Sequence, residues 1–346
     1  MNRVTITLMA VTALTVLSSC RHRDLCYDHP EHALRFSTDI TADFNRQWEI
    51  DNEGLPFWSA AWPEGYGMEY GDLHPLMPEG ILVTAYSEEG TVNARHLSNT
   101  GGVMEMTRGA NSLLMYNDDT EQIIFDNLHA TATARAATRG RSRSTYKGNA
   151  FARGPEDEER TVEMPDPLFV AAIDGYIQEA VTSAAPLSAT LQPVVFSYLV
   201  RFEFDHGIEY VGRARGVLAG MAESVYLFDG YTSKEKASYL FDCTVEDWGA
   251  QAIVKTFGIP DFPGILQWPT RGDDTFALNL ELRLRNGKML SFDCDVTDQV
   301  AAQPRGGVIV VTGLRVSDEE GKQDAPSGFD VDVDGWGEFE DIPIIL

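Results

Sequence analysis

The 346-residue sequence contains none of the short motifs that mark the common enzyme classes. Gly-x-Ser-x-Gly, His-Glu-x-x-His, phosphate-binding loops and Cys-x-x-Cys are all absent. Its seven histidines are scattered, and its carboxylates are so frequent that no pair stands out as a general acid and base. We therefore expect a protein that is not an enzyme and has no cofactor. A glycosidase-like hydrolase with an unrecognised carboxylate pair is a distant alternative.

Positive charge is also scarce. Lysine and arginine total 27 against 53 aspartates and glutamates, which gives a formal net charge of −26. A surface of this sign repels the phosphates of DNA and RNA, so we expect no nucleic acid among the partners. The same charge favours solubility outside the cell.

The longest apolar run lies near the N-terminus and is too short to cross a bilayer, which takes about 20 apolar residues. It extends from Val4 to Leu17 after a basic start, and this layout predicts a secretory signal over residues 1–19. The segment Leu17-Ser18-Ser19-Cys20 resembles a bacterial lipobox, in which the signal is removed before the cysteine and the thiol is acylated. An ordinary signal peptide with an incidental cysteine is the alternative.

Cys20 is therefore the expected lipidation site, carrying acyl chains such as palmitate, and residues 20–33 form the expected tether. The lipid is expected to anchor the mature protein in the outer membrane. Whether the protein faces the surface or the periplasm stays open, because Arg21-His22-Arg23-Asp24 lacks the acidic run expected of a surface-export signal.

Only four cysteines are present, and two of them lie in alternating runs. Cys243 and Cys294 each share the apolar side of such a run, so both are expected to point inward. A disulfide between them is possible in an exported protein. Two buried free thiols are equally compatible with the pattern.

Helix signals are few, and alternation of apolar and polar residues dominates the chain. Residues 196–204 and 278–284 alternate with a period of two, which indicates half-buried strands. Asn286-Gly287 predicts a hairpin after the second run, and a short helix is expected over Thr297–Ala302. Strands that follow one another without intervening helices predict an all-β fold with two immunoglobulin-like antiparallel β-sandwich domains.

The division between these domains is expected near residue 190, where prolines suit a linker. The prediction is an N-terminal sandwich over residues 34–190 and a C-terminal sandwich over residues 191–346; a boundary at residue 150 is the competing choice. An arginine-rich segment, residues 131–160, has no apolar period and is expected to be a long exposed loop of the first domain.

Exposed arginines in an exported protein are candidate sites for trypsin-like proteolysis. In the arginine-rich segment these are Arg139, Arg141 and Arg143. Arg46 is a further candidate, just after the first predicted strand. Cleavage there frees that strand and opens a groove along the sheet, where an incoming strand pairs with the exposed edge.

Trp58, Trp62 and Tyr66 lie in a segment rich in glycine and proline. Such aromatic side chains either stack on a sugar or contact a partner, or pack into the core. Near the C-terminus, Asp330, Asp332 and Asp334 have the spacing of a calcium loop. The valines between them favour a strand with an acidic outer face, because the alternation already explains the spacing, and we expect no metal site.

Several stretches together resemble one family: the lipobox, residues 23–30, 202–207, 298–300, 303–307 and 328–336. The chain resembles the fimbrillin-like lipoproteins of Bacteroidetes, in a branch catalogued as a domain of unknown function. The resemblance implies two transthyretin-like β-sandwiches, export as a lipoprotein, and a role as fimbrial subunit, tip or anchor. The implied partners are other fimbrial subunits or cell-surface components.

The resemblance also implies assembly by strand addition, in which a protease removes the N-terminal strand and a neighbour's C-terminal strand fills the groove. Arg46 matches the processing position only loosely, and Pro343 interrupts the short apolar end at residues 342–346. These departures favour an anchor or accessory protein in adhesion over a polymerising subunit. A carbohydrate-binding surface lipoprotein is the alternative.

Overall fold

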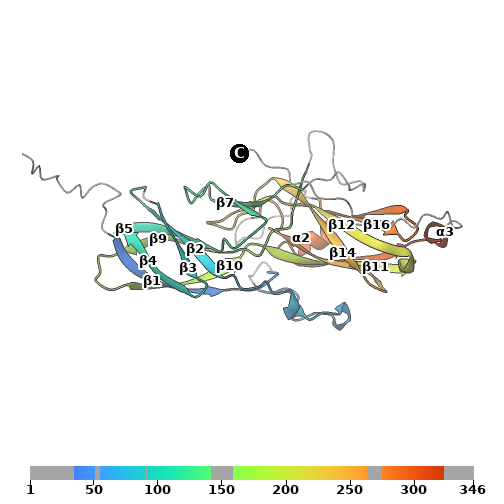
Figure 1. Cartoon of the computed structure of the whole chain (residues 1–346), viewed down its shortest axis with the longest axis horizontal. Helices are drawn as coiled ribbons and strands as arrows, with labels where there is room; N and C mark the ends of the chain where they lie inside the picture. Colours follow the sequence, from blue (N-terminus) through green and yellow to red (C-terminus); the bar gives the residue numbers. More distant parts are fainter. Residues whose placement is uncertain (1–34, 51–54, 91, 142–158, 263–274, 323–346) are drawn as a thin grey trace, which may run out of the picture. The chain divides into compact units, whose positions relative to one another are not determined.

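A computed structural model describes residues 35–50, 55–90, 92–141, 159–262 and 275–322 of the chain. Strands make up most of these residues, and the helices are short (Figure 1). The expected all-β fold class is thus confirmed. Within the described ranges, none of the helices has the length and apolar composition needed to cross a membrane.

The strands, helices and 3-10 helices (η) follow in chain order: β1 (Arg35–Phe44), η2 (Glu64–Tyr66), η3 (Tyr70–Leu73), β2 (Gly80–Ser87), β3 (Val92–Ser98), β4 (Gly101–Thr107), β5 (Gly109–Tyr116), β6 (Ile123–Asp126), β7 (Arg135–Thr138), β8 (Arg160–Val162), β9 (Phe169–Gln178), β10 (Ala185–Pro193), β11 (Phe196–His206), η4 (Ile208–Tyr210), β12 (Val211–Ala222), β13 (Ser224–Tyr226), β14 (Lys236–Val245), β15 (Gly249–Thr256), β16 (Ala277–Leu284), β17 (Met289–Asp295), α2 (Thr297–Ala302), β18 (Gly307–Arg315) and α3 (Asp318–Gly321).

The first sheet closes on itself as a barrel in the order β1-β10-β9-β5-β2-β3-β4. Its interior is filled by buried aliphatic side chains and methionines, among them Ile81, Met104 and Leu113. Closure brings β4 so near to β1 that a Cβ on Gly101 would lie 1.9 Å from the Ile40 carbonyl oxygen. Glycine is therefore required at this contact, and the closed ring leaves the sheet without an open edge.

The second sheet has the order β17-β16-β12-β14-β15-β11-β18, with β8 paired to β14. Its inward side chains form one core that includes Phe202, Tyr239 and Leu280. The alternating runs expected at residues 196–204 and 278–284 lie in β11 and β16. The expected half burial is wrong, because nearly all residues of β16 and the first seven of β11 are buried on both faces, including the polar ones. Gly287, with φ of 85°, turns the chain between β16 and β17, and the short helix appears as α2.

Part of the segment predicted as an exposed loop, residues 131–160, is strand. Arg135–Thr138 form β7, which pairs with β6 and β13, and Ala134, Ala136 and Thr138 are buried along one side. These side chains are small, so their alternation gives no apolar signal in the sequence. The predicted domain division at residue 190 stays a prediction; β10 ends at Pro193 and β11 begins at Phe196.

Cys243 and Cys294 are both free thiols, and the disulfide considered for them is wrong. Cys243 lies on β14 and Cys294 on β17, with β12 and β16 between them. Three strand spacings amount to roughly 14 Å, about twice the Cα separation that a disulfide spans. Burial raises the pKa of both thiols. Alternation identified the inward side of each strand but carried no information on strand order.

Candidate functional site

Strand β1 occupies the position between β10 and β4 in the barrel. It runs parallel to β10, with Thr38 opposite Ala185 and Phe44 opposite Leu191, and the Ala42 amide donates to the Thr100 carbonyl at 3.1 Å. Ile40 is 1% exposed. This strand comes from the start of the described chain, yet it completes a sheet made of later segments.

The inward side of β1 joins the barrel interior at several points. The Thr38 hydroxyl donates to Gln178 Oε1 at 2.5 Å, and the Phe44 ring meets Phe169 edge-on at 5.3 Å. Ile40 belongs to the same core cluster as Phe169. Loss of β1 would expose this cluster and remove the hydroxyl partner of Gln178.

Arg46, the candidate processing residue, follows β1 directly and is held on both sides. Its Nε donates to the Pro75 carbonyl at 2.9 Å, and the amide of the preceding Asn45 donates to the Leu191 carbonyl at 2.9 Å. Two residues on, the Trp48 carbonyl accepts from the Ser197 amide at 2.8 Å. Proteases prefer exposed loop tips, so cleavage after Arg46 requires local opening of this segment.

Two candidate processing residues of the arginine-rich segment, Arg139 and Arg141, are also held by backbone pairing. Arg139 has an exposed side chain, but its amide donates to the Gln122 carbonyl and its carbonyl accepts from the Glu163 amide. Arg141 donates to the Leu240 carbonyl at 3.1 Å and lies 3.4 Å from a Glu163 carboxylate oxygen. Arg143 and Cys20 lie outside the described residues, and their predicted roles stay predictions.

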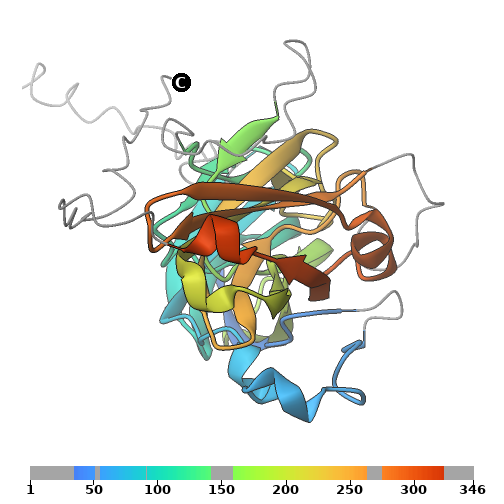
Figure 2. The same ribbon diagram turned by 90° about the vertical axis from the view of Figure 1, so that its right-hand side faces the viewer.

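The three aromatic candidates belong to a segment over residues 55–73, which we name the aromatic strap. Figure 2 shows the strap, in blue, running along the outside of the strands. The ring of Trp62 meets the rings of Trp48, Tyr66 and Tyr70 at centroid distances of 5.8, 5.3 and 5.6 Å. The rings thus pack mainly on one another, and Trp58, Trp62 and Tyr66 are each half-buried.

Polar groups fix the strap to the second sheet. The indole N–H of Trp58 donates to Gln303 Oε1 at 2.9 Å, whereas that of Trp62 donates within the strap to the Met68 carbonyl at 2.8 Å. The Arg201 guanidinium lies 4.4 Å from the centre of the Tyr66 ring and 3.8 Å from that of Trp248. Burial, with the Glu49 carboxylate nearby, raises the pKa of Tyr70. Both indole donors are therefore engaged within the protein.

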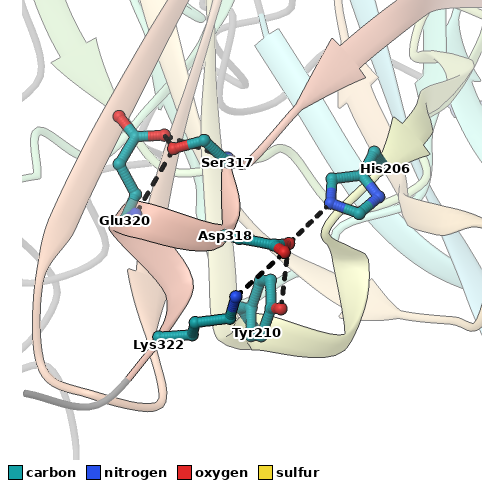
Figure 3. A network of polar contacts seen from close by, with 6 residues as sticks. All are labelled: His206, Tyr210, Ser317, Asp318, Glu320 and Lys322. Atoms are coloured by element: carbon teal, nitrogen blue, oxygen red, sulfur yellow. Dashed lines mark hydrogen bonds and ion pairs between the residues drawn. The ribbon is translucent and has the colours of Figure 1, made fainter.

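A second polar cluster joins α3 to the end of β11 and is shown in Figure 3. We name it the C-terminal latch: His206, Tyr210, Asp318 and Lys322. His206 Nε2 lies 2.9 Å from Asp318 Oδ1, Tyr210 donates to the same oxygen at 3.1 Å, and Lys322 Nζ donates to Oδ2 at 3.1 Å. These hydrogen bonds lower the pKa of Asp318 to about 2.

The sequence reasoning missed this latch, although one signal for it is present. Ser317 and Glu320 have the spacing of a capping box, and the Ser317 hydroxyl does accept from the Glu320 amide. That pattern predicts where α3 begins, but the approach of His206 depends on the fold. In the described ranges, no group of three or more His, Cys, Asp or Glu is placed to hold a metal ion. Asp330, Asp332 and Asp334 lie outside those ranges.

Comparison with known proteins identifies the family. A family model described as "Domain of unknown function (DUF5119)" matches residues 70–242, which is half of the chain. The chain belongs to this family. The resemblance to a Bacteroidetes branch catalogued as a domain of unknown function is thereby confirmed.

Among individual relatives of this DUF5119 member is a Bacteroides ovatus protein named "Putative fimbrium anchoring subunit Fim4B". It is 27% identical over 218 residues, which cover 62% of this chain and 54% of the relative. The chain thus spans about half the length of that relative.

One solved structure shares the fold, and a second gives a weaker match. A structure described as a putative adhesin from Bacteroides ovatus matches with a TM-score of 0.57 and 21% identity, covering 89% of this chain and 99% of that one. The fimbrial anchor protein Mfa2 from Porphyromonas gingivalis matches with a TM-score of 0.43 and 11% identity, covering 80% and 91%.

Proposed function

We propose that this protein is a non-enzymatic subunit of a fimbria-like assembly in the cell envelope, acting as an anchor or accessory protein in adhesion. The observation that carries the proposal is the position of β1, which closes the barrel between β10 and β4. The name of the Bacteroides ovatus relative, a fimbrium anchoring subunit, supports the same class of function.

Strand addition is the proposed mode of action, and β1 defines where it takes place. The space between β10 and β4 accepts one extended strand whose alternate side chains face the barrel interior. In this chain that strand is its own β1, with Thr38, Ile40 and Ala42 inward. A subunit that keeps β1 has no vacancy for a neighbour's strand, so it ends a series of strand additions at its barrel.

The links that hold Arg46 support retention of β1. The hydrogen bond from Arg46 to the Pro75 carbonyl and the backbone hydrogen bonds on both sides hinder cleavage in the folded state. The proposed attachment is lipid at Cys20, which fixes one end of the chain to the outer membrane. The proposed partners are other fimbrial subunits or cell-surface components.

Digestion of the purified mature chain with an arginine-specific protease tests this proposal. We expect the bond after Arg46 to stay intact under native conditions, as followed by mass spectrometry, and no filaments in electron micrographs. Digestion in urea is the positive control for the protease. Native cleavage after Arg46 followed by filament growth would show a polymerising subunit and reject the anchor assignment.

Sugar binding by Trp58, Trp62 and Tyr66 is the alternative. Its support is the half exposure of the three rings. The packing of Trp62 on Tyr66 and the engaged indole donors of both tryptophans weigh against it. Saturable binding on a glycan array, lost in Trp58→Ala and Trp62→Ala but kept in Phe57→Ala, would favour this alternative.

A further inference from the structure

Strand β18 lies at the margin of the second sheet. On one side it pairs in parallel with β11, where Tyr198–Phe202 face Gly307–Val311 in unbroken register. On its other side no strand of the described chain pairs with it. The sequence there is Gly-Val-Ile-Val-Val, and an unpaired edge of this composition is a template for a foreign strand.

Two glutamines bond the backbone groups on this side: Gln299 of α2 and Gln303, the C-cap residue that directly follows the helix. Gln299 donates through Nε2 to the Val310 carbonyl at 3.0 Å and accepts at Oε1 from the Val310 amide at 2.9 Å. Gln303 Oε1 accepts from the Val308 amide at 3.0 Å, and its Nε2 donates to the Val308 carbonyl. Each side-chain amide thus makes the two hydrogen bonds that one residue of a neighbouring strand would make.

Both glutamines can bond β18 because the spacing of residues along the helix is similar to the spacing along the strand. Residues four apart on an α-helix are separated by about 6 Å along its axis, and residues two apart on a strand by about 6.6 Å. Gln299 and Gln303 are four apart, and Val308 and Val310 are two apart. A helix running antiparallel to β18 therefore places both amides on successive outward-facing residues of the strand.

The surroundings hold the two amides in place. Val300, between them on α2, is fully buried in the core, and the Thr297 hydroxyl bonds both backbone groups of Phe276 at 3.0 and 3.2 Å. Trp58 of the aromatic strap donates to Gln303 Oε1 at 2.9 Å. A Cβ on Gly307 would lie 2.0 Å from that oxygen, so glycine is needed beside it.

We propose that Gln299 and Gln303 form an amide cap that closes the β18 edge to strand addition by a second copy of this chain. The strand that the cap keeps away is β18 of that second copy. Without the cap, the backbone groups of Val308 and Val310 would pair with their counterparts in an antiparallel, two-fold arrangement. Past Val311 the β18–β11 register is shifted by a bulge, and irregular backbone of this kind also blunts an edge. The cap covers the regular part.

The test combines amide exchange with the oligomeric state of the full mature chain. In Gln299→Ala/Gln303→Ala we expect the Val308 and Val310 amides to exchange roughly 10- to 100-fold faster in dilute protein, the loss of one hydrogen bond each. At higher concentration we expect dimers by light scattering, absent in wild type. The matched control is Gln251→Ala, a half-buried glutamine of β15 that accepts from Arg201 at 3.1 Å.

A third change shows whether the dimer forms through β18. Val310→Pro, added to the Gln299→Ala/Gln303→Ala variant, removes an N–H that points away from β11. An edge strand tolerates proline at such a position, and the substitution should abolish the dimer. If Gln303→Ala fails to fold, Gln299→Ala alone reports on Val310. Unchanged exchange at Val310 would overturn the cap. Faster exchange in a variant that stays monomeric, or a dimer that persists with Val310→Pro, would overturn its role as a seal.

Discussion

Deleting β1, so that the chain begins at Gln47, removes one strand from a closed barrel and tests the role proposed for that position. The fully buried Ile40 contributes about 1.5–3 kcal/mol by transfer of its side chain from water. The half-buried Phe44 and its contact with Phe169 add on the order of 1–2 kcal/mol. The hydrogen bond between Thr38 and Gln178 adds about 1 kcal/mol. Together these terms come to roughly 3.5–6 kcal/mol, a large part of the 5–15 kcal/mol that stabilises an ordinary domain.

We therefore expect the truncated chain to lose most of the free energy of unfolding of its barrel, with a much lower urea midpoint. A synthetic peptide of residues 35–44 should restore it, by about 2.7 kcal/mol at a peptide concentration 100 times its Kd. The matched peptide carries Ile40→Asp, which places a charge inside the barrel, and should not restore it. A truncated chain with an unchanged midpoint, or equal rescue by both peptides, would refute the assignment of β1 as a replaceable strand.

Three further changes test other parts of the structure. Gly101→Ala should destabilise the barrel by about 3 kcal/mol or more in urea unfolding, because it combines a φ of +103° with a clash at Ile40; Gly109→Ala, with φ of +106° and open space, should cost only about 1–2 kcal/mol, and equal effects would contradict the close approach of β4. Glu281→Leu should cost about 3–5 kcal/mol, because Arg215 lies 2.7 Å from that carboxylate and both side chains are 3% exposed or less; adding Arg215→Met should recover most of the loss, and a single variant as stable as wild type would contradict the buried pair. The pKa of Asp318 is lowered from 3.8 to about 2 in the folded state, so the latch should be intact above pH 3.8 and weaken as the pH falls through about 2. Protease cleavage after Lys322 should become faster in Asp318→Asn but not in Glu319→Gln. An equal increase in both variants would exclude the latch.

Local patterns predicted the elements whose signal is contained in a short window. The alternation at residues 196–204 and 278–284, the Asn286-Gly287 turn and the helix at Thr297–Ala302 all appear where expected. Strand β7 was not predicted, because its buried side chains are alanine and threonine, which give little hydrophobic signal. The disulfide failed for a different reason: a period of two shows which side of a strand is buried, but not how many strands lie between two cysteines.

Features that join distant segments were beyond reach of such patterns. The parallel pairing of β1 with β10 links residues about 150 positions apart, and nothing near residue 40 specifies that partner. Gln299 and Gln303 were visible in the sequence as part of a family motif, yet their contacts depend on where α2 lies against β18. The same holds for Trp58, whose indole reaches Gln303 across 245 positions.

The two sheets satisfy the backbone of a vulnerable strand in different ways, and the difference bears on partner choice. At the barrel, the position beside β10 is filled by a strand whose inward side chains fit the interior, so a foreign strand competes only if it reproduces that pattern. At β18, two amides bond backbone groups alone, and any extended chain offers the same groups. An uncapped β18 would therefore pair without regard to sequence. For a protein that takes part in strand addition, as we propose here, this arrangement gives specificity. The barrel position of β1 distinguishes incoming strands by their side chains, whereas the β18 edge, which cannot distinguish them, is closed.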